Sequence, residues 1–145
     1  MGKAGLGVVV HDSHGNAIAS LSEQASLPFS SVIVETMAAA RAITFAQELG
    51  INKFMLEGDS EAVINTLRSS EASLTTYGHL LDSAKSSLVT SKCIAFSHIR
   101  RSGNRVAHNL AKYARHVRGL SVWVEDMPPH LYDVIFLIPV DLSIK

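Results

Sequence analysis

Residues 54–62 read FMLEGDSEA and join an apolar run, a glycine between two carboxylates and the start of a helical pattern. The apolar run 54–56 predicts a buried strand, Gly58 predicts a tight turn, and the spacing that follows predicts a helix. Asp59 is therefore expected at the carboxyl end of a strand, where ligands bind in α/β sheets. Asp59 or Ser60 can cap this helix, and on local grounds capping explains Asp59 as well as a functional role does.

The composition is that of one globular domain. The chain has 145 residues, of which 47% are hydrophobic and 18% are charged, and it contains no low-complexity run. No run of about 18 apolar residues predicts a membrane span, and the N-terminus does not read as a signal peptide. We therefore expect a cytoplasmic or nuclear protein without a membrane partner. The single cysteine, Cys93, predicts a buried thiol in a reducing compartment.

Charge is balanced overall but unevenly distributed. The 13 basic residues match the 13 acidic ones, yet residues 92–118 hold seven Lys or Arg and no Asp or Glu. An ordinary solvated helix face is one explanation. The absence of any balancing acid favours the other, which is a basic face that meets a polyanion.

Strand-like and helix-like segments alternate along the chain. Residues 5–11 and 17–21 predict two strands, and Gly15-Asn16 between them suits a hairpin turn. Apolar periodicity then predicts helices at 32–49, 61–68, 76–88 and 104–116, and strands at 54–57 and 92–98. This order predicts an α/β fold with a mixed sheet, begun by a hairpin and continued by crossover helices.

Two helices carry candidate functional residues. Helix 32–49 has an apolar stripe and ends at Gly50, and Glu35 in its first turn also suits the helix dipole. That stripe is Val34, Ala38, Ala42, Phe45 and Leu49. In helix 104–116 the expected buried stripe is Val106, Leu110, Tyr113 and Val117. His108 lies well round from that stripe, so it is expected to point to solvent or to a site.

The tail after residue 118 differs in character from the rest. Residues 122–124 predict a short strand, Pro128 and Pro129 break regular structure, and the apolar segment 134–142 requires a cover.

Several ordered motifs together resemble one known family. They are GLGVVV at 5–10 with Asp12-Ser13-x-Gly15, Glu35-Thr-Met-Ala-Ala, Glu57-Gly58-Asp59-Ser60, the segment 98–111 from His98 to Ala111, and the tail elements Val122-Trp123 and Asp126-Met127-Pro128-Pro129. The sequence resembles the plant reverse-transcriptase-like branch of the type 1 ribonuclease H family, found in retroelement-derived polyproteins and small stand-alone proteins. The resemblance implies a ribonuclease H-like domain at 4–118 and a tail extension at 119–145.

The resemblance also implies a chemistry. Such enzymes use four carboxylates to hold two divalent metals, Mg²⁺ or Mn²⁺, which cut the RNA strand of an RNA/DNA hybrid. Glu35 and Asp59 would be two of these catalytic metal ligands, and His98 would assist proton transfer or product release. The implied contacts to the hybrid or to structured RNA come from Arg100, Arg101, Asn104, Arg105, Lys112 and Arg115.

Two departures from the family open an alternative. The first catalytic Asp belongs to a strand upstream of the glycine-rich segment, where this sequence begins. The fourth carboxylate is replaced by His108, and imidazole suits Mn²⁺ or Zn²⁺ better than Mg²⁺. The alternative is a catalytically degenerate domain that only binds RNA or hybrid. The missing first Asp and His108 favour this alternative, whereas Glu35 and Asp59, both kept in place, favour the hydrolase or a recent loss of activity.

The missing first strand has a structural consequence. In this fold that strand is central and pairs with the strands of Val8 and Leu56, so its absence leaves two apolar edges. The sequence is then a fragment, receives a strand from a partner, or fills the gap with residues 134–138. We favour the fragment, which predicts a poorly soluble or self-associating chain.

Two unrelated chemistries find little support. A serine or cysteine hydrolase lacks its G-x-S-x-G elbow, and Cys93 lies in the middle of a predicted strand. The seven histidines are scattered without the paired spacing of a zinc site.

Overall fold

The fold was analysed in a computed structural model. It describes residues 3–12, 17–26, 31–51, 53–68, 79, 82, 86, 92–99, 105–116, 119–124 and 133–137. The strands are β1 (Lys3–Asp12), β2 (Ala17–Ser26), β3 (Lys53–Gly58), β4 (Lys92–His98), β5 (Leu120–Val124) and β6 (Asp133–Leu137). The helices are α1 (Ser31–Glu48), α2 (Glu61–Arg68) and α4 (Arg105–His116).

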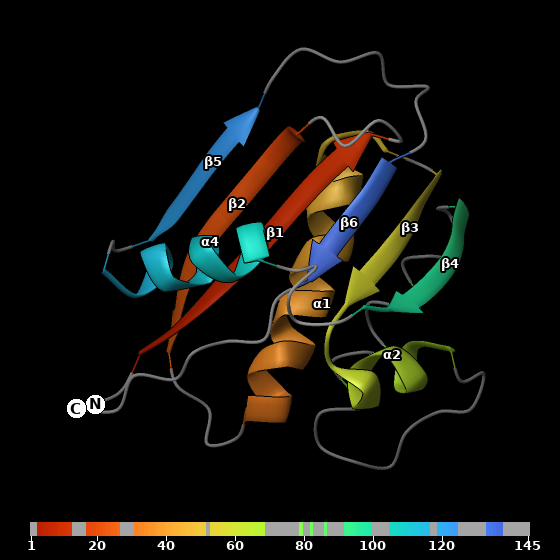
Figure 1. The fold of residues 1–145 in the computed structure, drawn as a ribbon, viewed down its shortest axis with the longest axis horizontal. Coiled ribbons are helices and arrows are strands. Elements are labelled where there is room, and N and C mark those ends of the chain that lie inside the picture. Colours follow the sequence, from red (N-terminus) through yellow and green to blue (C-terminus); the bar gives the residue numbers. More distant parts are fainter. Residues whose placement is uncertain are drawn as a thin grey trace.

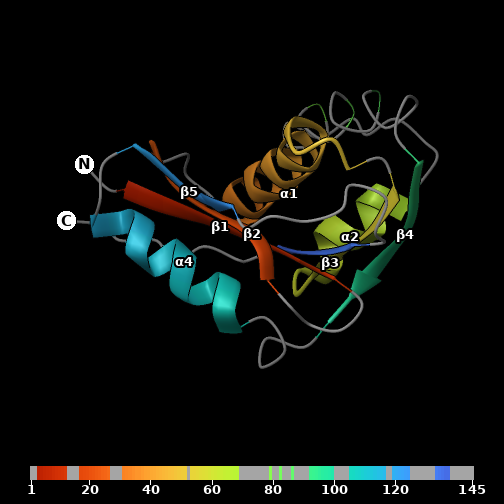
Figure 2. The same ribbon diagram turned by 90° about the horizontal axis from the view of Figure 1, so that it is seen from above.

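The six strands form one mixed sheet in the order β4-β3-β6-β1-β2-β5 (Figure 1). β1 pairs antiparallel with β2, which confirms the predicted hairpin, and β3 pairs parallel with β4. α1 and α4 cover opposite faces of this sheet, as the view from above shows (Figure 2). The predicted α/β class and mixed sheet are thus confirmed.

The centre of the sheet is β6, a strand from the tail. It pairs antiparallel with β1 and parallel with β3, so Ile135 lies opposite Val10 on one side and Leu56 on the other. The expected open edges are therefore wrong for these two strands, because β6 covers both. Of the three arrangements considered, the structure has the one in which the tail fills the gap.

The main core lies between the sheet and α1 with α2. Side chains alternate along a strand, so every second residue of β1 and β3 points to this core, including the fully buried Val8 and Leu56. The α1 stripe is confirmed, since its first four members are buried and Leu49 packs partly against them. The helix ends as predicted, where Gly50 at φ 75° and Ile51 donate to the carbonyls of Gln47 and Ala46.

On the opposite face, α4 packs through its alanines. Ala111 and Ala114 are buried, whereas Tyr113 is 45% exposed, so the predicted apolar stripe is wrong at that residue. The reason is the small residue beneath the helix. A Cβ at Gly5 of β1 would lie 1.9 Å from the Ala111 carbonyl oxygen, so only glycine permits so close an approach. The side chains of Val106 and Val117 lie outside the described residues.

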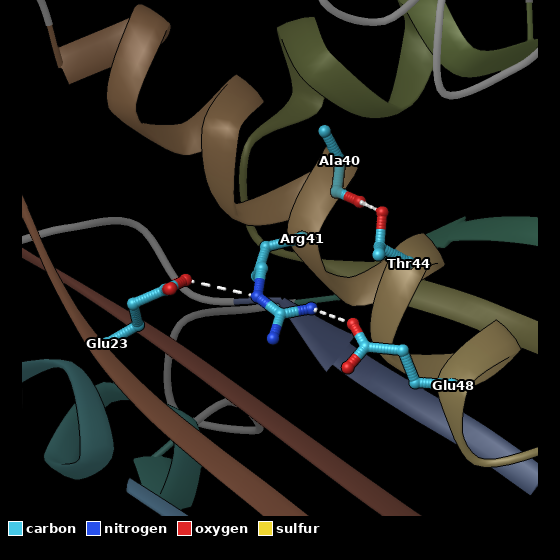
Figure 3. Close-up of polar contacts among 5 residues, drawn as sticks. All are labelled: Glu23, Ala40, Arg41, Thr44 and Glu48. Carbon is cyan, nitrogen blue, oxygen red and sulfur yellow. Dashed lines mark hydrogen bonds and ion pairs between the residues drawn. The ribbon is translucent and has the colours of Figure 1, made fainter. Parts of the chain in front are cut away.

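A polar cluster links α1 to the hairpin. Arg41 of α1 donates to a Glu23 carboxylate oxygen on β2 at 3.0 Å and to Glu48 at 2.6 Å (Figure 3). Its guanidinium carbon also lies 6.0 Å from the centre of the Phe45 ring. The Arg41 side chain is only 17% exposed, so these partners compensate the partial burial of its charge.

Of the remaining predictions, some are confirmed and others fall outside the described residues. The strand predicted at 122–124 is confirmed by β5, and the helix predicted at 104–116 is confirmed by α4. Most of 76–88 lies outside the described residues, although His79, Asp82 and Ser86 are helical. Gly15-Asn16 and the Cys93 side chain also lie outside them. Among the described helices, none is long and apolar enough to cross a membrane.

Candidate functional site at the ends of the parallel strands

Three strands end together around Asp59. β3 runs parallel to β4 and to β6, and its last residue, Gly58, lies opposite His98 on one side and Leu137 on the other. The ring nitrogen Nε2 of exposed His98 is 3.2 Å from the Asp59 backbone oxygen, and the Ile99 amide donates to the Gly58 carbonyl at 2.9 Å. The structure thus brings Asp59 and His98 together at one edge of the sheet.

The turn after β3 contains both candidates for the N-cap of α2, Asp59 and Ser60. The Val63 amide donates to the Ser60 hydroxyl at 3.4 Å, and the Ile64 amide donates to the Ser60 carbonyl at 3.1 Å. Ser60 is therefore the residue that caps α2. The Asp59 carboxylate oxygens are shielded from solvent, although the residue as a whole is only half-buried. Of the two capping candidates, the structure selects Ser60.

Glu35 lies on α1, which packs against β1 and β6. The helix begins at Ser31 and has no acidic residue in its first turn, so the expected position of Glu35 in that turn is wrong. Helix-dipole effects fall off within the first turn, so the dipole gives little reason for a carboxylate here. Glu35 is half-buried, and the structure leaves its proposed role as a metal ligand open.

The predicted nucleic-acid contacts fall partly on α4. Arg105 and Lys112 are exposed there. His108 and Arg115 also belong to α4, but their side chains lie outside the described residues. Arg100, Arg101 and Asn104 lie outside the described residues altogether.

Sequence reasoning missed a titratable pair on the α4 side of the sheet. Glu57 and His11 each follow a core residue, Leu56 and Val10, so both point to the opposite face. Burial raises the pKa of the Glu57 carboxyl above its ordinary value of 4.5, and the nearby His11 acts in the opposite sense. The alternation of the strands could have placed Glu57 on this face, but its burial follows only from the three-dimensional structure.

Replacing Glu57 with Gln is expected to raise the thermal midpoint at neutral pH. A carboxyl with a raised folded-state pKa favours folding below the unfolded pKa, and this contribution is lost as pH rises through the folded pKa. The advantage of Glu57→Gln over the parent should therefore shrink as pH falls toward 4.5. Melting curves across this range test it. Glu61→Gln, at an exposed position in the first turn of α2, should give no such gain in thermal midpoint. A difference in midpoint between Glu57→Gln and the parent that does not change with pH would contradict the raised pKa of Glu57.

The described residues do not assemble the donor set of a two-metal centre. Among the described residues, no group of three or more His, Cys, Asp or Glu side chains could hold a metal ion. β6 occupies the slot between β1 and β3, and its residue beside Gly58 is Leu137. Its one acid, Asp133, lies opposite Phe54 at the other end of β3, roughly 13 Å away at the usual rise per residue.

Comparisons with known proteins agree with this fold. The sequence profile of a family described as reverse transcriptase-like matches residues 1–114. A solved structure of RNase H1 from the halophilic archaeon Halobacterium salinarum is similar, with a TM-score of 0.70 and 22% sequence identity. The similarity covers 77% of this chain and 85% of that one. The search of curated proteins found no match.

Proposed function

The chain belongs to the reverse transcriptase-like family, whose domain is ribonuclease H-like, and from that premise we propose that it binds RNA/DNA hybrid or structured RNA without cutting it. Binding rests on the basic segment 92–118, whose described exposed residues include Arg105 and Lys112 on α4. Lys and Arg contacts to phosphates supply affinity with little sequence information.

The proposed lack of cleavage rests on one observation. The slot in which the family's first strand would bring an Asp beside Asp59 is filled by β6, whose residue at that height is Leu137. With His108 in place of the last carboxylate, two of the four acids remain, Glu35 and Asp59. Two carboxylates do not neutralise two divalent cations. Cleavage of RNA that depends on Mg²⁺ or Mn²⁺ therefore lacks the carboxylates needed to hold the metal ions.

The second candidate is a metal-dependent hydrolase. It is favoured by the position of His98 beside Asp59 at the strand ends, with Nε2 3.2 Å from the Asp59 backbone oxygen. It is also favoured by the capping of α2 through Ser60, which leaves the Asp59 carboxylate without that structural role.

An assay with a labelled RNA/DNA hybrid separates the two candidates. We expect salt-sensitive binding and no cleavage in Mg²⁺ or in Mn²⁺. Glu35→Gln and Asp59→Asn should leave the affinity within about twofold, because charge at that edge of the sheet is not used for binding. Cleavage that disappears in either variant would overturn the proposal in favour of the hydrolase. Absence of cleavage, together with absence of binding both to the hybrid and to a structured RNA hairpin, would overturn both candidates.

A further inference from the structure

The solvent side of α4 is cationic and bears no acid. Arg105, Asn109, Lys112 and His116 are exposed at spacings of four, three and four residues, so they share one face of the helix. Nearby in sequence there is no compensating acid either, since no Asp or Glu occurs from residue 83 to residue 124. This face therefore attracts a polyanion.

An exposed aromatic pair lies where α4 meets β5. Tyr113 and Trp123 are each 45% exposed, and their ring centroids are 5.8 Å apart with an interplanar angle of 63°. Trp123 lies opposite Ser20 on β2, and two residues further along β2 the Ser22 hydroxyl donates to the α4 carbonyl of Leu110. Because residues two apart on a strand share a face, Trp123 is on the α4 side of the sheet.

We propose that this aromatic pair stacks against an unpaired base of single-stranded nucleic acid whose phosphates lie along the cationic face of α4. The site deepens the proposed function and rests on it. Aromatic side chains beside a positively charged track are the usual means of binding single strands, because every base offers a face for stacking. In a blunt duplex the bases are already stacked on one another, so the pair should add little there.

Charge favours nucleic acid over a protein partner at this place. A protein docked on the pair would also meet the cations of Lys112 and Arg105, and α4 itself carries no acid to balance them. The apolar side chains of β5 that would suit a protein, Val122 and Val124, alternate with Trp123 and so point to the other face of the sheet.

Trp123 is the only tryptophan, so its emission reports directly on the site. The probe is an unlabelled oligothymidylate single strand, with a blunt RNA/DNA hybrid of equal phosphate content for comparison. The expected result is quenching of the emission as the single strand saturates, and much weaker quenching by the hybrid. Unchanged emission at saturation, with binding verified by anisotropy of a labelled strand, would overturn the proposal even if no variant folds.

Substitutions then measure the contribution of stacking. Trp123→Ala should weaken single-strand binding roughly 5- to 150-fold, while Trp123→Phe retains most of the affinity. Val124→Ala removes an exposed apolar group from the other face of the same strand and should bind like the parent. For charge, Lys112→Ala should lower the salt dependence of binding, whereas Lys53→Ala, an exposed lysine on β3, should not.

The outcomes of these experiments distinguish failure of the stacking site from failure of the proposed function on which it rests. If Trp123→Ala keeps its thermal midpoint and binds single strands like Val124→Ala, the stacking site is wrong but nucleic-acid binding stands. If the parent binds neither single strand, hybrid nor a structured RNA hairpin, the proposed function fails together with the site. Strong and equal loss on single strand and hybrid would also overturn the stacking site, because a duplex offers it no unpaired base.

Discussion

Ile135→Pro is expected to lower the free energy of unfolding by about 3 kcal/mol or more. Ile135 lies at the middle of β6, where the backbone is paired with Val10 of β1 and with Leu56 of β3. Proline has no amide hydrogen, so one ladder hydrogen bond is lost and a buried carbonyl loses its donor. Because folded domains are stable by only about 5–15 kcal/mol, a loss of this size removes a substantial share of the total stability.

The matched control is Ile135→Ala, which retains the backbone amide. Both variants lose the isoleucine side chain, so the difference between their denaturant midpoints reports the loss of the amide hydrogen together with the steric demands of the proline ring. If the two variants unfold at the same denaturant concentration, β6 does not occupy the centre of the sheet. In that case the explanation for the absent carboxylate beside Asp59 falls as well.

The elements that the sequence predicted share a strong local signal. The hairpin of β1 and β2, the strand before Asp59 and the α1 stripe each combine a clear period with turn or cap residues at their ends. The proximity of His98 to Asp59 was implied by the family resemblance, and the structure accounts for it by parallel strands whose carboxyl ends lie together.

The place of β6 could not be read from its own residues. An apolar run predicts burial but not which two strands will flank it, and filling of the gap by residues 134–138 was only one of three arrangements considered. The structure pairs the run with β1 and β3, which are far away in sequence and would otherwise each have an unpaired edge at this place. The pairing of β6 depends on tertiary contacts, so a local sequence pattern cannot predict it.

The buried face of α4 was predicted only in part, for a related reason. Of the large apolar residues expected at the contact, Leu110 packs partly against the core, Tyr113 is exposed, and the described residues that are fully buried are Ala111 and Ala114. Glycine at position 5 lets the backbone approach so closely that larger side chains do not fit between. Tyr113 is consequently turned out toward Trp123, and the aromatic pair could be recognised only from the structure.

Gly5→Ala is expected to disturb both stability and nucleic-acid binding. Its Cβ would lie 1.9 Å from the Ala111 carbonyl oxygen and 3.1 Å from the Ala114 Cβ, and a backbone atom cannot rotate away. The helix must shift by about 1 Å or more to restore normal contact, and we expect a loss of about 3 kcal/mol, at the upper end for overpacked sites. The shift also moves the cationic face of α4, so single-strand affinity should fall at temperatures where the variant is folded.

Gly50→Ala separates the two effects. Gly50 has φ 75° and an added Cβ would meet nothing within 4 Å, so the substitution should cost roughly 1–2 kcal/mol through backbone strain alone. Because Gly50 ends α1, on the other face of the sheet, its replacement should leave the α4 surface and the affinity unchanged. Thermal melts and anisotropy titrations of both variants test this. Equal affinity for the parent and Gly5→Ala would mean that the position of α4 is not what sets binding, and the nucleic acid must then be held by another surface.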